Sequence, residues 1–395
     1  MANSFPKIIL LPGKERSVLF RHPWLFSGAV KEIKGNPAEG DSVEVYSAGG
    51  EYLATGHYHD GSIKVRMYSF SQTDGSRAFW KEKLSSALDL RKKLGLYPNP
   101  DCNMFRLVHG EGDGFPGLIV DVYGSCAVLQ AHSVGMLREL NKISTALQEL
   151  FGHKLETIFD KSIESLPEIV TPENQQKYLL GSAPSAIVKE HGVSFRVNWE
   201  EGQKTGFFLD QRENRKLLGS YSRGKKVLNA FSYSGGFSMY ALTGGAELVH
   251  SVDSSKKAAA WARENAKLNS GEDRHEFFEE DVFDYLKKTE QDYDLVILDP
   301  PAFAKHLKAA DKAMIGYRNL NTEGLRKISA GGILFTFSCS QVIDKILFRK
   351  IIFQAAVQAK RNVRVLHQLS QGPDHPVSIY HPEGEYLKGL VLYVD

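Results

Sequence analysis

The chain has 395 residues, of which 42% are hydrophobic and 24% charged, and its formal net charge is +2. This length predicts two or three domains, and the composition excludes a disordered or fibrous protein. A net charge so close to zero excludes a uniformly basic nucleic-acid binder, so any such surface has to be a local patch. The cysteines, Cys102, Cys126 and Cys339, form no CxxC pair, which argues against a disulfide framework and a zinc site, and we expect no bound metal. No apolar run is long enough for a signal peptide or a membrane span, so we expect a cytoplasmic protein with no membrane partner.

Residues 1–75 are predicted to form a small β-barrel with little helix. "DSVEVYSAGGEYLATGHY" alternates apolar and polar residues on both sides of Gly49-Gly50, which is a hairpin signal. Arg21 lies in a basic turn and is a candidate phosphate contact. Trp24 is a candidate stacking surface for a base, although core packing is the commoner use of such a side chain.

Residues 76–188 are predicted to form a central α/β domain. "RAFWKEKLSSALDLRKKLGL" places Trp80, Leu84 and Leu88 at helical spacing beneath a basic face, which we expect to be solvated. "FRLVHGEGDGFPGLIVDVYGSCAVLQAHS" contains two strand-like runs, and a helix is expected over about 137–150. The polar connection "SLPEIVTPENQQ" then leads to the last domain.

Residues 189–395 are predicted to form a doubly wound domain with a parallel sheet. From Lys225 onward, apolar strand-like runs alternate with helical patterns. The expected strands are 225–231, 246–253, 275–281, 293–299 and 331–338. Because ligands of such sheets bind outside the carboxyl ends of the strands, chemistry is expected at those ends.

The first two strand ends carry a glycine turn and a carboxylate. In "NAFSYSGGFSMYA", Gly235 and Gly236 let the backbone approach a ligand closely, although a tight turn explains them equally well. Asp253 ends the next strand, where a carboxylate binds the ribose hydroxyls of a cofactor. The G-x-G-x-x-G fingerprint is absent, which counts against a nicotinamide cofactor.

The next two strand ends are also acidic. Asp281 in "EEDVF" is placed to hold a cofactor amine or ring edge, with a solvated acidic turn as the alternative. Asp299 in "YDLVILDPPAFAK" precedes Pro300 and Pro301, which cannot continue a strand ladder. A stiff exit with a fixed carboxylate suits the edge of a planar amide or amidine base.

Cys339 closes the last predicted strand, "GGILFTFS". Free cysteine is usually a small buried residue, which is the simpler interpretation. A strand end beside a cofactor crevice is also where a nucleophile is expected, so both interpretations stay open at this point. Cys102 and Cys126 lie outside the βαβ pattern and are expected to be structural.

Several of these motifs resemble those of a known family. "NAFSYSGGFSMYA", "SVD", "EEDVF" and "LDPPAF" look like cofactor and target-base motifs of S-adenosylmethionine-dependent nucleic-acid methyltransferases, and "KTGFFLDQRENR" looks like the segment preceding them in the bacterial ribosomal RNA subset. "RHPWLFSGAV", "FSCSQ" and "DHPVSIYHPEGEYLKG" resemble the bacterial large-subunit ribosomal RNA cytosine-C5 methyltransferases more narrowly. The resemblance runs nearly end to end. It implies an N-terminal PUA domain, a central α/β domain, a Rossmann-like catalytic domain, S-adenosylmethionine as cofactor and ribosomal RNA as substrate.

The resemblance also implies roles for single residues. Cys339 would be the nucleophile that adds to C6 of cytosine, and Asp299 would bind the N3 and amino edge of the base. No second cysteine follows the Asp-Pro motif, so the group that removes the C5 proton is not identified. The expected cofactor contacts are Gln211, Arg212, Asn229, Phe231, Ser232, Gly235, Gly236, Asp253, Asp281 and Asp299. The expected substrate contacts are Arg21, Trp24, Lys204, Pro300, Pro301 and Phe303.

Three alternatives stay open on the sequence. An RNA methyltransferase acting on an exocyclic base amine also uses an Asp-Pro-Pro strand end but needs no nucleophile. An RNA-binding assembly factor could keep the fold without activity, although the intact acidic and glycine positions argue against it. A nicotinamide oxidoreductase follows if the glycine turn is misread. The resemblance allows a homodimer, which no apolar stripe in the sequence requires.

Overall fold

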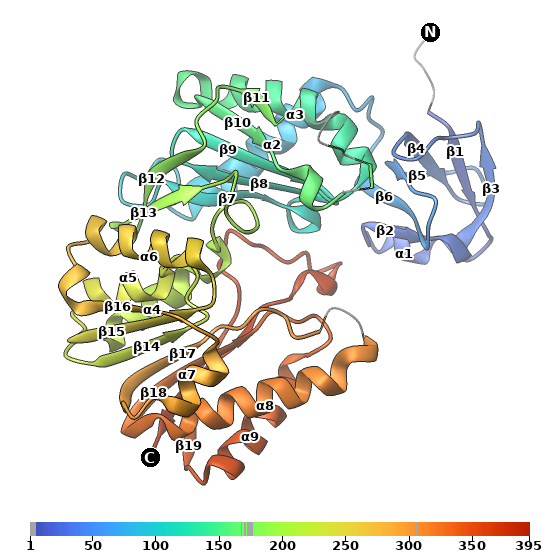
Figure 1. Ribbon diagram of the computed structural model, residues 1–395. Coiled ribbons are helices and arrows are strands. Elements are labelled where there is room, and N and C mark those ends of the chain that lie inside the picture. The colour runs from blue at the N-terminus through green and yellow to red at the C-terminus, as the bar shows by residue number, and fades with distance from the viewer. Residues whose placement is uncertain (1–4, 167, 170, 172–176, 305–306) are drawn as a thin grey trace. The chain divides into compact units, whose positions relative to one another are not determined.

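The computed structural model describes residues 5–166, 168–169, 171, 177–304 and 307–395. The chain forms two compact units (Figure 1). The first contains Met1–Val188, Val197–Phe207 and Pro373–Gly384, and the second contains Lys189–Arg196, Phe208–Gly372 and Glu385–Asp395. Two segments that follow residue 189 therefore belong to the first unit.

A six-stranded sheet forms the N-terminal part of the first unit, in the order β2-β6-β5-β4-β1-β3. Its elements are β1 (Lys7–Leu10), α1 (Arg16–Leu19), β2 (Trp24–Phe26), β3 (Val30–Lys34), β4 (Ser42–Tyr46), β5 (Tyr52–Tyr58) and β6 (Ile63–Ser69). The predicted hairpin is present as the antiparallel pair β4 and β5. Gly50 in its turn has a φ of 86°, a conformation that glycine adopts without strain. Alternate residues such as Val43 and Val45 are buried in the core of this sheet.

A five-stranded sheet follows, in the order β11-β10-β9-β8-β7. Its elements are α2 (Arg77–Lys93), β7 (Met104–His109), β8 (Leu118–Tyr123), β9 (Cys126–Ala131), α3 (Val134–Phe151), β10 (Thr157–Asp160) and β11 (Tyr178–Leu180). Trp80, Leu84 and Leu88 of α2 are buried against the sheet and α3, as their spacing predicts.

Two expectations about this region were wrong. Residues 104–131 contain three strands instead of two, and the basic face of α2 is only partly solvated. The Arg91 guanidinium is fully buried and forms a double hydrogen bond with the Asp113 carboxylate, at 2.5 and 2.8 Å. Lys83 donates to the Tyr68 carbonyl at 3.0 Å. A charge that meets a partner from another segment can be buried, and helical periodicity gives no sign of that.

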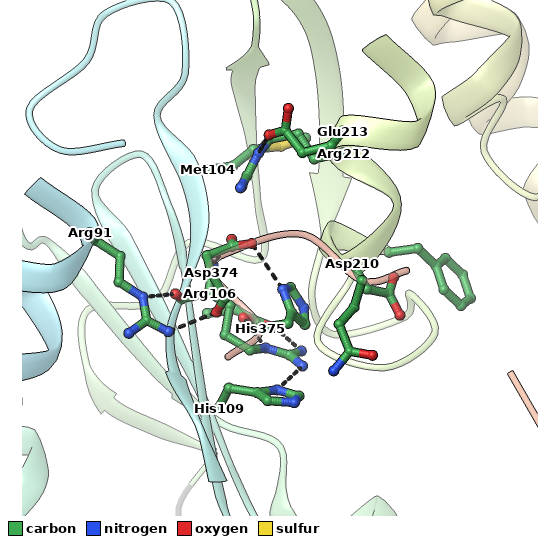
Figure 2. Close-up of polar contacts among 12 residues, drawn as sticks. Arg91, Met104, Arg106, His109, Asp210, Arg212, Glu213, Asp374 and His375 are labelled. Atoms are coloured by element: carbon green, nitrogen blue, oxygen red, sulfur yellow. Dashed lines mark hydrogen bonds and ion pairs between the residues drawn. The ribbon is translucent and has the colours of Figure 1, made fainter. Parts of the chain in front are cut away.

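The loop Pro373–Gly384 packs into the first unit through a buried polar cluster (Figure 2). The backbone N–H of Arg106 in β7 donates to the Asp374 carboxylate at 3.0 Å, and Arg91 Nη2 donates to the Asp374 carbonyl at 2.7 Å. His375 Nδ1 lies 3.0 Å from the Asp374 carboxylate, and its ring lies 5.0 Å from that of His109. These contacts give His375 a structural role in holding the loop.

The second unit is built on a seven-stranded sheet in the order β16-β15-β14-β17-β18-β20-β19. Its strands are β14 (Lys226–Ala230), β15 (Leu248–Asp253), β16 (His275–Glu279), β17 (Tyr293–Leu298), β18 (Ile328–Ser338), β19 (Val363–Leu369) and β20 (Lys388–Val394). Its helices are α4 (Arg212–Tyr221), α5 (Gly236–Thr243), α6 (Lys256–Leu268), α7 (Val282–Lys288), α8 (Ala310–Arg326) and α9 (Lys345–Ala359). A separate two-stranded sheet, β12 (Ser185–Glu190) and β13 (Val193–Asn198), precedes them. The first five predicted strands are parallel neighbours, as expected, and β20 adds antiparallel to β18.

The parallel register brings the strand ends to one edge of the sheet. Ala230 pairs with Val252, and Leu298 pairs with Thr336. The segments that follow β14, β15, β17 and β18 therefore start close together, which is the position where such sheets bind ligands. In the described part of the chain, no helix is long and apolar enough to cross a membrane.

Candidate active site

The loop after β14 is strained where it turns into α5. Phe231 and Tyr233 have φ values of 58° and 46°, in the left-handed region that side chains other than glycine rarely adopt. Gly235 has a φ of 79°, and a Cβ there would lie 3.2 Å from Met239 Cε and 3.3 Å from Ala262 Cβ. The left-handed conformation favours glycine, and a Cβ would in addition lie tightly against its neighbours. Such strain is concentrated at ligand-binding sites in proteins, where the surrounding fold maintains it.

Asp253 ties this loop to the end of β15. Its Oδ2 accepts from the backbone N–H of Tyr233 at 2.9 Å, and its Oδ1 accepts from the N–H of Ser255 at 3.0 Å. Each carboxylate oxygen has a second lone pair available for another donor. The carboxylate is thereby fixed in orientation, at the strand end where a ribose hydroxyl would reach it.

Three buried polar atoms near this loop have no hydrogen-bond partner among the described residues. They are the hydroxyl oxygens of Ser232 and Ser234 and the side-chain oxygen of Asn229. Asn229 Nδ2 donates to Ser238 Oγ in α5 at 2.8 Å, so its amide faces the protein interior. An unsatisfied buried polar group costs about 1–3 kcal/mol, and a polar ligand at this loop would remove that cost. These residues therefore fit a polar cofactor.

Asp281 has a structural function that is visible in its contacts. Its Oδ1 accepts from the backbone N–H groups of Phe283 and Asp284, at 2.8 and 3.2 Å, and so caps the N-terminus of α7. The side chain is exposed. A cap of this kind explains an aspartate here without a ligand, and cofactor binding by Asp281 stays a prediction.

Asp299 follows β17 and is held by an amide. Gln211 Nε2 donates to Asp299 Oδ2 at 3.0 Å, and Gln211 Oε1 accepts from Asn214 Nδ2 at 2.6 Å. Both amide side chains are buried. Arg212, also buried, donates from Nε to Glu213 Oε1 at 3.0 Å. Gln211, which is predicted from the sequence as a cofactor contact, thus orients Asp299, which is predicted as a contact of the target base.

The loop that follows Asp299 is hydrogen-bonded to the loop that follows β18. Pro300 is buried and Pro301 is exposed. The Phe303 ring packs on Tyr317 of α8 with a centroid distance of 4.6 Å. Ser340 Oγ donates to the Ala304 carbonyl at 2.6 Å, which fastens the cysteine segment to the Asp-Pro-Pro loop.

Cys339 is the first residue after β18 and is partly exposed, whereas Cys102 and Cys126 are buried. Burial raises the pKa of the Cys126 thiol well above its ordinary value, so that thiol is unreactive. Cys339 follows β18 and Asp299 follows the neighbouring parallel strand β17, so both residues stand at the same edge of the sheet.

Sequence reasoning missed two residues beside Cys339. Lys388 begins β20, and Tyr317 lies in α8. Burial raises the pKa of the Tyr317 phenol to about 12, and Cys339 and Asp299 act in the same direction, so this phenol stays protonated near neutral pH. The only hint of Lys388 in the sequence is a lysine at the start of the apolar run "LKGLVLYV".

The remaining predicted substrate contacts, Arg21, Trp24 and Lys204, belong to the first unit. Arg21 is exposed and lines a cavity of about 950 Å³ together with Phe70, Lys83 and Tyr380. Lys204 is also exposed.

Trp24 is held by several side chains of the same unit. Its Nε1 donates to Glu111 Oε1 at 2.8 Å, and the His381 ring lies 4.4 Å from the indole. These contacts favour the packing interpretation of Trp24 over base stacking.

Comparison with known proteins agrees with this geometry. Residues 164–377 match a family of S-adenosylmethionine-dependent methyltransferases, and residues 8–70 match a PUA-like domain family. The ribosomal RNA large subunit methyltransferase I of Alteromonas mediterranea is 38% identical, with 98% of both chains covered. Its counterpart in Escherichia coli is 37% identical, with 98% of this chain and 99% of that protein covered.

Solved structures show the same fold at lower identity. An S-adenosylmethionine-dependent methyltransferase from Streptococcus mutans has a TM-score of 0.82 and 23% identity, with 98% of this chain and 99% of that chain covered. A methyltransferase crystallised in complex with SAH has a TM-score of 0.83 and 24% identity, with the same coverage.

The sheet, its strand-end loops and the family match define the chain as an S-adenosylmethionine-dependent methyltransferase with an N-terminal PUA-like domain. Its cofactor is S-adenosylmethionine, and its fold class is the one expected from the sequence. The sequence identity over nearly the full length shows the family: the chain belongs to the ribosomal RNA large subunit methyltransferase I family.

Proposed function

We propose that this protein methylates carbon C5 of a cytosine in large-subunit ribosomal RNA, with Cys339 as a covalent nucleophile. The substrate class follows from the name of its relatives. The observation that carries the mechanism is the position of Cys339, a partly exposed thiol on the strand next to that of Asp299. The bond between Ser340 and the Ala304 carbonyl keeps the two loops together.

The chemistry needs a nucleophile because C5 of cytosine is barely nucleophilic by itself. Bound S-adenosylmethionine supplies an electrophilic methyl group. The Cys339 thiolate adds to C6, and the electron pair of the C5–C6 bond makes C5 reactive. A proton shared between the Asp299 carboxyl group and N3 of the ring favours the addition. Once C5 carries the methyl group, a water molecule accepts the C5 proton, the C6–S electron pair returns to sulfur and the thiolate is regenerated.

The cofactor is held, in this proposal, by the loop after β14 and the two following strand ends. The Ser232 hydroxyl and the Asp253 carboxylate are the best supported contacts, because the first is buried without a described partner and the second is fixed by two backbone N–H groups. The complete proposed set is Gln211, Arg212, Asn229, Phe231, Ser232, Gly235, Gly236, Asp253, Asp281 and Asp299.

The RNA contacts are proposed on both units. Pro300, Pro301 and Phe303 adjoin the site of the reaction, and Arg21 and Lys204 would contact RNA on the first unit. The RNA contact predicted for Trp24 is disfavoured by its packing against Glu111 and His381. The division into domains 1–75, 76–188 and 189–395, a cytoplasmic location and a homodimer stay predictions.

The methylated nucleoside tests the proposal. Ribosomal RNA methylated by the purified protein is digested to nucleosides and analysed by liquid chromatography and mass spectrometry. We expect 5-methylcytidine with the wild type, none with Cys339→Ala, and wild-type product with the control Cys102→Ala. A product methylated on the exocyclic amine, or full activity of Cys339→Ala, would contradict the proposal.

A further inference from the structure

Lys388 is a buried lysine beside the candidate nucleophile. It begins β20, which pairs antiparallel with β18, and it stands directly opposite Ser338. Its side chain is only 5% exposed. Lysine is almost never buried to this extent without a partner, because removing an ammonium group from water is costly. The position therefore needs a compensating group.

Two carbonyl oxygens fix the Lys388 ammonium group in place. Nζ donates to the Ser340 carbonyl and to the Tyr386 carbonyl, both at 2.6 Å. The first of these carbonyls belongs to the residue that follows Cys339. An ammonium group has three protons, and the two carbonyls take two of them. The side chain is thus anchored to the backbone of the cysteine segment in one orientation.

Cys339 is the strongest charged influence on Lys388. Burial lowers the pKa of Lys388 to about 8, and a negative charge on Cys339 is the first effect that raises it again. The carboxylates of Glu385 and Asp344 also raise the pKa of Lys388, and Lys345 lowers it. The ammonium form of Lys388 is therefore the main form at neutral pH.

Two further groups at this edge of the sheet, Tyr317 and Asp299, supply no positive charge. Cys339 and Asp299 both act on Tyr317, whose phenol is neutral, and the carboxyl group of Asp299 cannot carry a positive charge. Lys388 is a positively charged group that interacts directly with a negative charge on Cys339.

We propose that Lys388 is the positioning residue of Cys339, and that its anchored ammonium group holds the thiol as a thiolate, ready to add to C6 of cytosine. The thiol proton leaves to water, and Lys388 keeps its own proton. A thiolate beside a fixed cation forms at a lower pH than a free thiol does, and the thiolate is the reactive species. This inference rests on the proposed function, because it concerns the same nucleophile.

The test measures the thiol directly and needs no RNA. The full-length protein is treated with iodoacetamide between about pH 5 and about pH 9, and the alkylation rate of the Cys339 peptide is followed by mass spectrometry. Cys102 and Cys126 are buried and serve as internal references in each sample. We expect the Cys339 rate to reach half its maximum well below the ordinary thiol pKa of about 8.5.

Three variants separate charge from structure. Lys388→Gln keeps a donor for the carbonyls but loses the charge. In this variant we expect the Cys339 alkylation rate to reach half its maximum at least one pH unit higher than in the wild type, and to be about tenfold lower at acidic pH. Lys388→Arg keeps the charge and should keep the wild-type profile. The control Lys350→Met removes an exposed charge from α9 and should leave the profile unchanged.

A Lys388→Gln profile that superposes on that of the wild type would overturn the proposal, provided that thermal unfolding shows a folded variant. This outcome is independent of the proposed function. If Cys339→Ala retained cytosine methylation, the covalent mechanism would fail even if Lys388 controlled the reactivity of the thiol.

Discussion

At the scale of single residues, Asp299 illustrates how the fold fixes a carboxylate at a strand end. A carboxylate on a flexible loop would sample many orientations, and a base edge needs one. Gln211 supplies the constraint, since its amide donates to Asp299 while Asn214 holds the amide from the other side. The Asn214 amide in turn donates to the Ser370 carbonyl at 3.2 Å. The orientation of Asp299 is therefore set by Gln211 and, through it, by Asn214.

Asp299→Asn is expected to reduce the turnover number of methyl transfer by about a hundredfold or more, with a smaller change in KM for RNA. The amide cannot exchange a proton with the base, although it has nearly the same shape. Steady-state kinetics with labelled cofactor measures both constants. The control Asp292→Asn changes an exposed residue and should have wild-type kinetics. Equal turnover numbers for the two variants would remove Asp299 from the reaction.

Local sequence indicates some of the candidate site residues and not others, because only some of them stand at recognisable strand ends. Asp253, Asp299 and Cys339 each stand at the end of an apolar run, and local sequence marks such positions. Lys388 reaches the cysteine segment through an antiparallel strand pair, and the residue that it contacts lies 48 positions earlier. No local pattern contains that information.

At the scale of elements, the parallel strands β14 to β18 were predicted well because each is a buried apolar run followed by a helical pattern. β7 was missed as a separate strand because a charge interrupts it. Arg106 forms a double hydrogen bond with the Asp121 carboxylate of β8, with both distances at 2.8 Å. Once paired, this arginine is buried like its apolar neighbours, and the sequence shows only the charge.

His57 shows how tightly β5 packs against the helices of the first unit. Its ring lies 4.7 Å from that of Tyr68 and 6.4 Å from that of Trp80 in α2. A Cβ at Gly135 in α3 would lie 2.2 Å from the His57 ring. Burial lowers the pKa of His57 to about 3, and the positive charges of Lys142 and Arg138 act in the same direction. The imidazole is therefore neutral in the folded protein.

This neutral histidine predicts an acid-sensitive fold. In the unfolded chain His57 has its ordinary pKa of 6.5, so the unfolded state binds one more proton between pH 6.5 and about pH 3. The contribution to stability is fully present above pH 6.5 and is lost as the pH falls through this window. Urea denaturation at several pH values, followed by fluorescence, measures the free energy of unfolding.

We expect that free energy to fall less steeply with decreasing pH in His57→Leu than in the wild type. The control His153→Leu, at an exposed position, should keep the wild-type slope. Identical slopes for His57→Leu and the wild type would show that His57 is not the acid-sensitive group.

At the scale of the whole molecule, the chain passes between the two units several times. It leaves the second unit at Gly372, contributes the loop Pro373–Gly384 to the first and returns at Glu385. The prediction of a last domain that runs unbroken from residue 189 did not foresee this, because the loop is stabilised by arginines more than 260 residues earlier in the chain.

Asp374→Ala is expected to loosen this loop. The change removes the acceptor of the Arg106 N–H group inside the protein, at a cost of about 1–3 kcal/mol. Hydrogen exchange followed by mass spectrometry should show faster exchange in peptides that cover 373–384 and β7. Asp292→Ala should leave these peptides unchanged, and an unaltered exchange rate in Asp374→Ala would contradict the proposed role of the cluster in Figure 2.

The central claim is that Cys339 forms a covalent bond with its target base, and trapping that bond tests it most directly. RNA that contains 5-azacytosine is incubated with the protein and cofactor, because nitrogen at position 5 has no proton to lose and the enzyme cannot be released. We predict a denaturation-resistant adduct whose peptide map places the RNA on Cys339, and no adduct with Cys339→Ala. Methyl transfer by the wild type without any adduct, or an adduct that survives in Cys339→Ala, would contradict the account.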